Sequence, residues 1–276
     1  MAEPIRAVLG GVEVGDGRPL LLIAGPCVLE SEAQALHHAG RVKALAARHG
    51  LPVVYKASFD KANRTSAKSF RGVGLEAGLA ALGRVRAEVG LPCLTDVHEA
   101  WQAEPVGKVV DILQVPAFLC RQTDLVRACA RHGRGVNVKK GQFLAPRDMA
   151  HVLAKCREEG NANVLLTERG ASFGYGDLVV DMRALVKMRE LGAPVCFDAT
   201  HAVQRPGGAG EASGGEREFA APLARAAAAV GIDALFLEVH EDPSQALSDG
   251  PNSLDFEMAD RLLADVLRLR RALGAP

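Results

Sequence analysis

The 276-residue sequence has no excess charge of either sign, no closely spaced cysteine pair and no apolar segment long enough to span a membrane. Lys plus Arg and Asp plus Glu each number 33, so the chain lacks the basic face that nucleic acid or an anionic membrane would attract. We therefore expect no nucleic-acid partner and no membrane partner. The six scattered cysteines and the absence of a signal peptide favour a reducing, cytoplasmic location over a disulfide framework.

Apolar residues are plentiful by contrast, at 48% of the chain, while charged residues account for 24%. This balance favours a large buried core and excludes extensive disorder. The length fits one (β/α) barrel or two small domains.

Short apolar segments alternate with longer amphipathic ones, which favours an α/β fold, a single (β/α)8 TIM barrel forming one domain over residues 1–276. An open doubly wound sheet would usually carry a glycine fingerprint after its first strand, and Gly25-Pro26-Cys27 is not one. A short β-hairpin is expected at 5–14. The predicted strands are 20–25, 53–56, 91–96, 111–115, 135–139, 163–168, 194–199 and 233–238, and the predicted helices are 31–49, 75–89, 99–108, 122–132, 147–158, 178–191, 217–230 and 255–273.

Two long segments follow the last two predicted strands, at 201–216 and 239–254. Barrel enzymes build their sites from the loops at the carboxyl ends of the strands. Long glycine-containing loops at that face are candidate active-site lids.

Every predicted strand ends in a polar or reactive residue, an arrangement that is hard to explain as surface decoration. These residues are Cys27, Lys56, Asp96 with His98, Gln114, Lys139 with Lys140, Glu168 with Arg169, Asp198 with His201, and Glu238 with His240.

Closure of the barrel brings the first strand beside the last, which predicts a divalent metal site formed by Cys27, His201, Glu238 and Asp249. Thiolate and imidazole ligands favour iron(II), zinc, manganese or cobalt over magnesium. Taken singly, Cys27 is more often a small buried hydrophobe and His201 a core histidine. Their joint placement on neighbouring strands favours the metal site.

The opposite half of the mouth gathers cations, which would repel one another unless a multiply charged anion lies between them. We therefore predict a ligand that carries phosphate, carboxylate or both. The cations are Lys56, Lys61, Arg64, Lys139 and Arg169, placed around Gln114 and Asp96.

Several long motifs carry a resemblance over about residues 20–265. They include KASFDKANRTS (56–66), TDVHE (95–99), PAFLCRQTDL (116–125), NVKKGQF (137–143), SFGYGDLVVDMR (172–183) and DATHAVQ (198–204). The chain resembles the 3-deoxy-D-manno-octulosonate 8-phosphate synthase family. Related heptulosonate 7-phosphate synthases, which use erythrose 4-phosphate as acceptor, typically have Lys-Pro-Arg where this chain has Lys61-Ala62-Asn63-Arg64. Asn63 with Arg64 favours the octulosonate branch.

The resemblance implies condensation of phosphoenolpyruvate with D-arabinose 5-phosphate and water, with release of phosphate, for lipopolysaccharide core synthesis. It also implies a homotetramer, and the metal-dependent branch, because metal-independent members have Asn at the position of Cys27. Phosphoenolpyruvate would be held by Lys56, Lys61, Gln114, Lys139 and Arg169. The arabinose phosphate would be held by Asn63, Arg64, Thr65 and Ser66.

Three acidic or basic groups are candidates for moving protons in this reaction, namely Asp96, His201 and Asp249. The sequence does not choose among them. Two other classes of function stay open at this point. One is a Schiff-base aldolase with Lys56 or Lys139 as nucleophile, and the other is a non-catalytic phosphosugar-binding protein.

Overall fold

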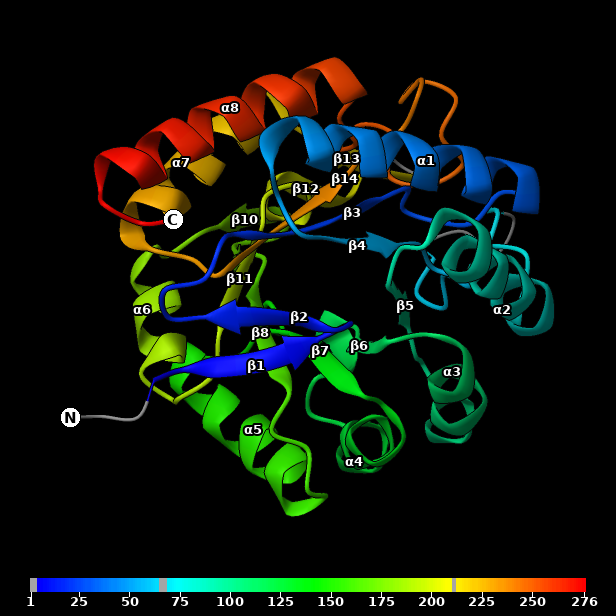
Figure 1. The fold of residues 1–276 in the computed structure, drawn as a ribbon, viewed down its shortest axis with the longest axis horizontal. Helices are drawn as coiled ribbons and strands as arrows, with labels where there is room; N and C mark the ends of the chain where they lie inside the picture. The colour runs from blue at the N-terminus through cyan, green and yellow to red at the C-terminus, as the bar shows by residue number, and fades with distance from the viewer. Residues whose placement is uncertain (1–3, 65–68, 210–211) are drawn as a thin grey trace.

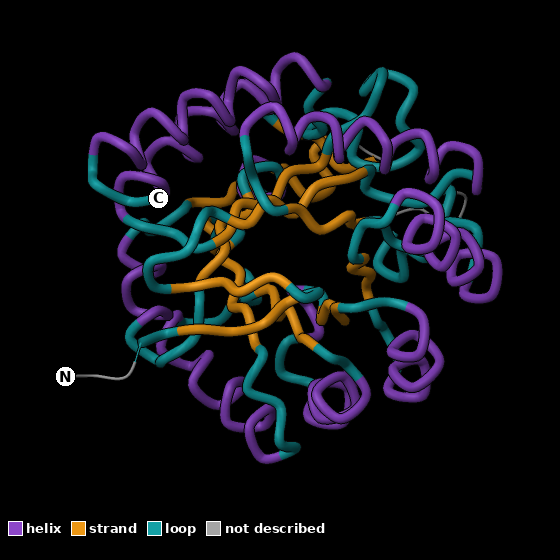
Figure 2. The backbone as a smooth tube through the Cα atoms, in the orientation of Figure 1, coloured by secondary structure: helices purple, strands orange, loops and turns teal. Residues whose placement is uncertain are grey.

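A computed structural model of the chain describes residues 4–64, 69–209 and 212–276. Within those residues, eight parallel strands close into a barrel in the order β11-β14-β3-β4-β5-β6-β7-β8, and helices surround it (Figures 1 and 2). The predicted (β/α)8 barrel is thus confirmed. The barrel strands are β3 (Leu21–Gly25), β4 (Val53–Lys56), β5 (Cys93–Asp96), β6 (Ile112–Val115), β7 (Gly135–Lys139), β8 (Val164–Glu168), β11 (Val195–Asp198) and β14 (Ala234–Glu238).

Closure depends on the pairing of the first and last barrel strands. β14 pairs with β3 in parallel over five residues, and Glu238 lies opposite Gly25. A Cβ atom on Gly25 would lie 2.0 Å from the carbonyl oxygen of Lys56, so glycine is required there. This close approach brings the ends of β14, β3 and β4 together at the carboxyl face.

Two of the longer helices, α1 and α8, begin at a side-chain cap. Ser31 caps α1 by accepting a hydrogen bond from the Gln34 amide, and Gly50 ends that helix in the left-handed conformation. Asp255 caps α8 in the same way. The helices are α1 (Glu32–His49), α2 (Leu75–Arg84), α3 (Ala103–Val109), α4 (Thr123–His132), α5 (Met149–Glu158), α6 (Arg183–Arg189), α7 (Ala220–Val230) and α8 (Phe256–Ala272).

The barrel strands are buried on both faces, and two apolar cores result. The larger lies between barrel and helices, and the smaller fills the barrel interior. An N-terminal hairpin of β1 (Arg6–Leu9) and β2 (Val12–Gly15) packs Ala7, Leu9 and Val14 onto the smaller core. In Figure 1 this hairpin lies across one end of the barrel.

Two predicted segments differ from the structure. The helix expected at 178–191 begins only at Arg183, because 171–179 forms a hairpin of β9 (Ala171–Phe173) and β10 (Asp177–Val179). Gly174 and Gly176 between its strands both have positive φ, which turns the chain back.

The segment 201–216, expected to be an irregular loop, carries regular structure. It contains a short 3-10 helix (His201–Val203) and an antiparallel ribbon of β12 (Gln204–Ala209) and β13 (Ala212–Gly215). In the described part of the chain, no helix has the length and apolar character needed to cross a membrane.

Candidate active site

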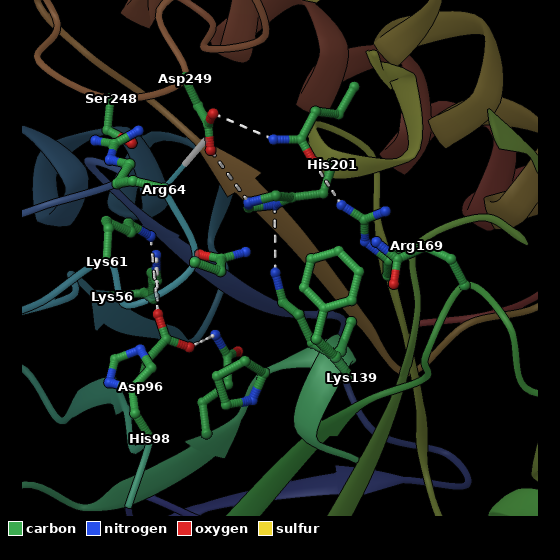
Figure 3. Close-up of a pocket in the computed structure, with 17 residues that line it drawn as sticks. Lys56, Lys61, Arg64, Asp96, His98, Lys139, Arg169, His201, Ser248 and Asp249 are labelled. Atoms are coloured by element: carbon green, nitrogen blue, oxygen red, sulfur yellow. Dashed lines mark hydrogen bonds and ion pairs between the residues drawn. The ribbon is translucent and has the colours of Figure 1, made fainter. Parts of the chain in front are cut away.

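A pocket opens at the carboxyl ends of the barrel strands and gathers most of the predicted site residues (Figure 3). Thr65 and Ser66 lie outside the described residues. Cys27 and Glu238 are buried beside the pocket. The predicted residues that line it are Lys56, Lys61, Asn63, Arg64, Asp96, Gln114, Lys139, Arg169, His201 and Asp249.

Three of the four predicted metal ligands converge. Ligand atoms of Cys27, Glu238 and Asp249 all lie within 4.8 Å of one another. His201 does not belong to that group, but its Nε2 lies 3.4 Å from Glu238 Oε1 and 3.7 Å from Asp249 Oδ2. Figure 3 shows Asp249 and His201 facing each other across this corner of the pocket.

The donor set fits a divalent cation. Glu238 is fully buried, yet its Oε2 has no hydrogen-bond partner among the described residues. An unpaired buried carboxylate oxygen is costly unless a cation or a donor meets it. Burial, followed by the charges of Asp249 and Glu238, raises the pKa of Cys27 above its ordinary value. A cation at this point would favour the thiolate instead.

Asp198 orients His201 toward this corner. Asp198 Oδ2 lies 2.7 Å from His201 Nδ1, and its Oδ1 accepts from the His201 amide. A proton on Nδ1 shared with Asp198 leaves Nε2 as the free lone pair, the arrangement that metal-binding histidines commonly use. The sequence placed Asp198 at a strand end but gave it no role.

Three of the predicted cations, Lys56, Lys61 and Lys139, also contact carboxylates of the protein. Lys56 lies 3.4 Å from Glu238 and 3.9 Å from Asp96, and Lys61 lies 3.8 Å from Asp96. Lys139 contacts Asp198 at 2.5 Å. The predicted metal-binding group and the predicted cation group therefore lie in contact, since Lys56 also donates to the carbonyl of Cys27 at 3.0 Å.

These contacts fix the charge of the buried acids. Burial would raise the pKa of Asp96, but Lys56 and Lys61 outweigh it and hold that pKa well below its usual range. For Asp198, His201 and Lys139 outweigh burial in the same way. Both acids are therefore ionised at neutral pH.

A chain of hydrogen bonds orients Gln114 across the barrel interior. The Thr167 hydroxyl donates to Asn137 Oδ1 at 2.6 Å, Asn137 Nδ2 donates to Gln114 Oε1 at 2.8 Å, and Gln114 Nε2 donates to Asp96 Oδ1 at 2.6 Å. Ser58 donates to the other oxygen of Asp96. Asp96 thus accepts bonds on both oxygens.

Comparison with known proteins agrees with this geometry. The DAHP synthetase I family matches residues 4–272. The chain belongs to this family. Relatives named 2-dehydro-3-deoxyphosphooctonate aldolase come from Synechococcus sp. (60% identical; 99% of this chain and 96% of the relative), Alkalilimnicola ehrlichii (59%; 95% and 94%) and Bordetella petrii (56%; 95% and 94%). The resemblance found in the motifs is confirmed.

The pocket is lined mainly by polar and charged side chains, as expected for a family whose relatives act on phosphorylated compounds. The site residues that were predicted from their position at a strand end lie side by side at the carboxyl face of the barrel. Ser248 and Gln204 were missed because one comes from the loop after β14 and the other from the ribbon β12–β13, whose courses the barrel-strand pattern does not determine. Ser248 accepts a hydrogen bond from the Cys27 thiol at 2.9 Å, and Gln204 contacts both Arg169 and Asp249.

Proposed function

We propose that this protein condenses phosphoenolpyruvate with D-arabinose 5-phosphate and water, giving 3-deoxy-D-manno-octulosonate 8-phosphate and inorganic phosphate. The observation that carries the proposal is the 56–60% identity, over nearly the full chain, to relatives that bear the aldolase name. The pocket supports it, because its buried lysines and arginine suit two phosphorylated substrates.

The residues divide the pocket by depth. Lys56, Gln114 and Lys139 lie at the base, each at most 5% exposed, and would hold phosphoenolpyruvate together with Lys61 and Arg169. Asn63 and Arg64 stand on the loop after β4 and would hold the sugar phosphate, with Thr65 and Ser66 beside them in sequence. Alignment of two phosphorylated substrates by fixed cations supplies much of the acceleration expected of such a site.

The structure favours different roles for the three candidate proton movers. Asp96 is held as a carboxylate by two lysines, Ser58 and Gln114, so we assign it to keeping those groups in place. His201 and Asp249 line the open pocket and stay the candidates for moving a proton near the reacting carbons.

We further propose that Cys27, His201, Glu238 and Asp249 hold one divalent cation, iron(II), zinc, manganese or cobalt. When bound, such an ion supplies Lewis acidity toward an oxygen of the substrates or of water. The unpartnered Oε2 of Glu238 and the Asp198–His201 contact support this assignment. A homotetramer and a cytoplasmic role in lipopolysaccharide synthesis stay predictions of the family resemblance.

The acceptor substrate is tested by phosphate release. Purified protein is given phosphoenolpyruvate with either arabinose 5-phosphate or erythrose 4-phosphate, and the sugar product is identified by mass. We expect turnover with the five-carbon acceptor and formation of the octulosonate phosphate. Preference for erythrose 4-phosphate would instead make the protein a heptulosonate phosphate synthase. Borohydride trapping of substrate on Lys56 or Lys139 would indicate a Schiff-base aldolase.

Removal of metal tests the second proposal. Treatment with a chelator followed by desalting should abolish phosphate release, and addition of iron(II), zinc or manganese should restore it. The ion content before and after treatment is measured by mass spectrometry, which separates loss of metal from loss of folded protein. Full activity of a preparation shown to contain no metal would contradict the assignment.

A further inference from the structure

Gln204 joins the two chemical halves of the pocket. It follows the short helix that carries His201 and opens strand β12. Its Oε1 accepts a hydrogen bond from Arg169 Nη2 at 2.8 Å, and its Nε2 donates to Asp249 Oδ1 at 3.2 Å. Figure 3 shows Arg169 and Asp249 on either side of His201.

The two neighbours determine which way the amide points. An arginine side chain can only donate hydrogen bonds, and an ionised aspartate can only accept them. A primary amide offers one acceptor and one donor group, so Gln satisfies both. A carboxylate at the same place would repel Asp249, and an apolar side chain would satisfy neither neighbour.

Each neighbour has a second polar group that Gln204 does not contact. The other terminal nitrogen of Arg169, Nη1, is buried without a partner in the described part of the chain. The other oxygen of Asp249, Oδ2, lies 3.3 Å from the Cys27 sulfur and 3.7 Å from His201 Nε2. The amide therefore takes up one group of each side chain and leaves Asp249 Oδ2 at the metal corner and Arg169 Nη1 without a partner among the described residues.

Asp249 also has an uncommon backbone conformation. It has a φ of 50°, in the left-handed region that non-glycine residues seldom adopt. We propose that Gln204 is a positioning residue that holds Arg169 and Asp249 in one arrangement, so that a single side chain prepares both the phosphoenolpyruvate-binding half and the metal-binding half of the pocket. The inference rests on the proposed function.

The test uses Gln204→Met, which keeps the length of the side chain and removes both hydrogen bonds, and Gln204→Ala as a second truncation. Gln245→Met is the matched control, because Gln245 is exposed on the same loop as Asp249 and its side-chain amide donates to the Ser244 hydroxyl, away from the pocket residues named here. Metal-stripped proteins are titrated with Mn²⁺ alone by electron paramagnetic resonance, and with phosphoenolpyruvate alone by calorimetry.

We expect Gln204→Met to weaken Mn²⁺ binding by about tenfold, as loss of a metal ligand's outer partner usually does. Phosphoenolpyruvate binding should weaken by about fivefold, the effect of one lost hydrogen bond. The KM for arabinose 5-phosphate and the thermal midpoint should stay near those of the parent and of Gln245→Met. A merely structural role would lower the thermal midpoint without weakening Mn²⁺ and phosphoenolpyruvate binding selectively.

Unchanged binding of both ligands in folded Gln204→Met and Gln204→Ala would overturn the proposal. A change for one ligand alone would overturn it too, because the amide would then serve one half only. Neither titration contains the sugar acceptor. If the parent protein makes no octulosonate phosphate, the proposed function is refuted, but the two titrations still test the role of Gln204.

Discussion

His38 on α1 is a titratable residue outside the pocket with a clear consequence for stability. It is only 2% exposed, its ring lies 5.0 Å from that of His240, and its Nδ1 has no partner in the described part of the chain. Burial, followed by the charge of His240, lowers the pKa of His38 from 6.5 to about 4. The folded protein therefore resists protonation here more than the unfolded chain does.

Stability should consequently fall as pH is lowered from about 6.5 to about 4, where the unfolded chain binds a proton that the folded chain does not, and this loss should level off below that window. Between pH 7 and pH 5 the contribution of His38 is about 2 kcal/mol. We expect His38→Gln to reduce by this amount the pH dependence of the unfolding free energy measured in urea. His37→Gln, the same change at an exposed neighbour, should leave the dependence near that of the parent, and equal slopes for all three proteins would contradict the assignment.

Residue-level prediction from sequence worked where the backbone pattern placed a side chain at a strand end. Lys56, Gln114 and Lys139 lie in the pocket because the strands are in register. The pairing of Lys139 with Asp198 could not be predicted, since both the strand spacing and the side-chain rotamers decide it. Asp249 lies where it does through a left-handed backbone that its sequence does not announce.

At the scale of elements, Glu168 at the end of β8 forms a buried ion pair with Lys140, the residue that follows β7. Lys140 Nζ lies 3.6 Å from Glu168 Oε1, and both side chains are about 1% exposed. Each residue directly adjoins a pocket residue, Lys139 or Arg169. Burial raises the pKa of Glu168, and the charge of Lys140 opposes that rise.

Removal of one partner should cost far more than removal of both. Lys140→Met leaves a buried carboxylate uncompensated and should destabilise the protein by about 3–5 kcal/mol, whereas Lys140→Met with Glu168→Gln should recover part of that loss. Urea unfolding of the single and double variants measures the coupling. The exposed pair of Lys108 and Glu104 on α3, changed in the same way, is the control and should show little coupling. Additive effects at Lys140 and Glu168 would argue against the pair.

Element prediction succeeded best for the barrel strands, whose β-branched and apolar runs are buried on both faces and end at glycine, proline or charge. It failed for the ribbons β9–β10 and β12–β13, which are exposed or rich in glycine and small residues. The β9–β10 turn contains two glycines of positive φ, and β10 contacts β12, so pairing here does not depend on an apolar period in the sequence.

For the whole molecule, the N-terminal hairpin matters more than its length suggests. Leu9 is fully buried and belongs to the core that fills the barrel interior. A Cβ atom on Gly135, at the start of β7, would lie 2.8 Å from the Leu9 side chain, so the glycine leaves room for it. The hairpin is also held by a hydrogen bond from the Val8 amide to Asn163 at 2.8 Å.

Leu9→Ala should therefore destabilise the whole barrel, by about 3 kcal/mol, because it leaves a cavity in the interior core. Val8→Ala on the same hairpin is the control, since Val8 is 44% exposed and should have little effect. Both variants are compared with the parent by urea unfolding followed by far-ultraviolet circular dichroism. Equal stability of the two would mean that the hairpin adds nothing to the barrel.

The hairpin also determines how substrates and products reach and leave the pocket. Ala7, Leu9 and Val14 close the amino end of the barrel with apolar side chains. Reactants and released phosphate must therefore enter and leave through the pocket opening at the opposite end. An inhibitor need not reach the deepest lysines to be effective. A bulky anion that bridges Asn63 and Arg64 to Gln204 would block the pocket opening and prevent exchange of the molecules bound below it.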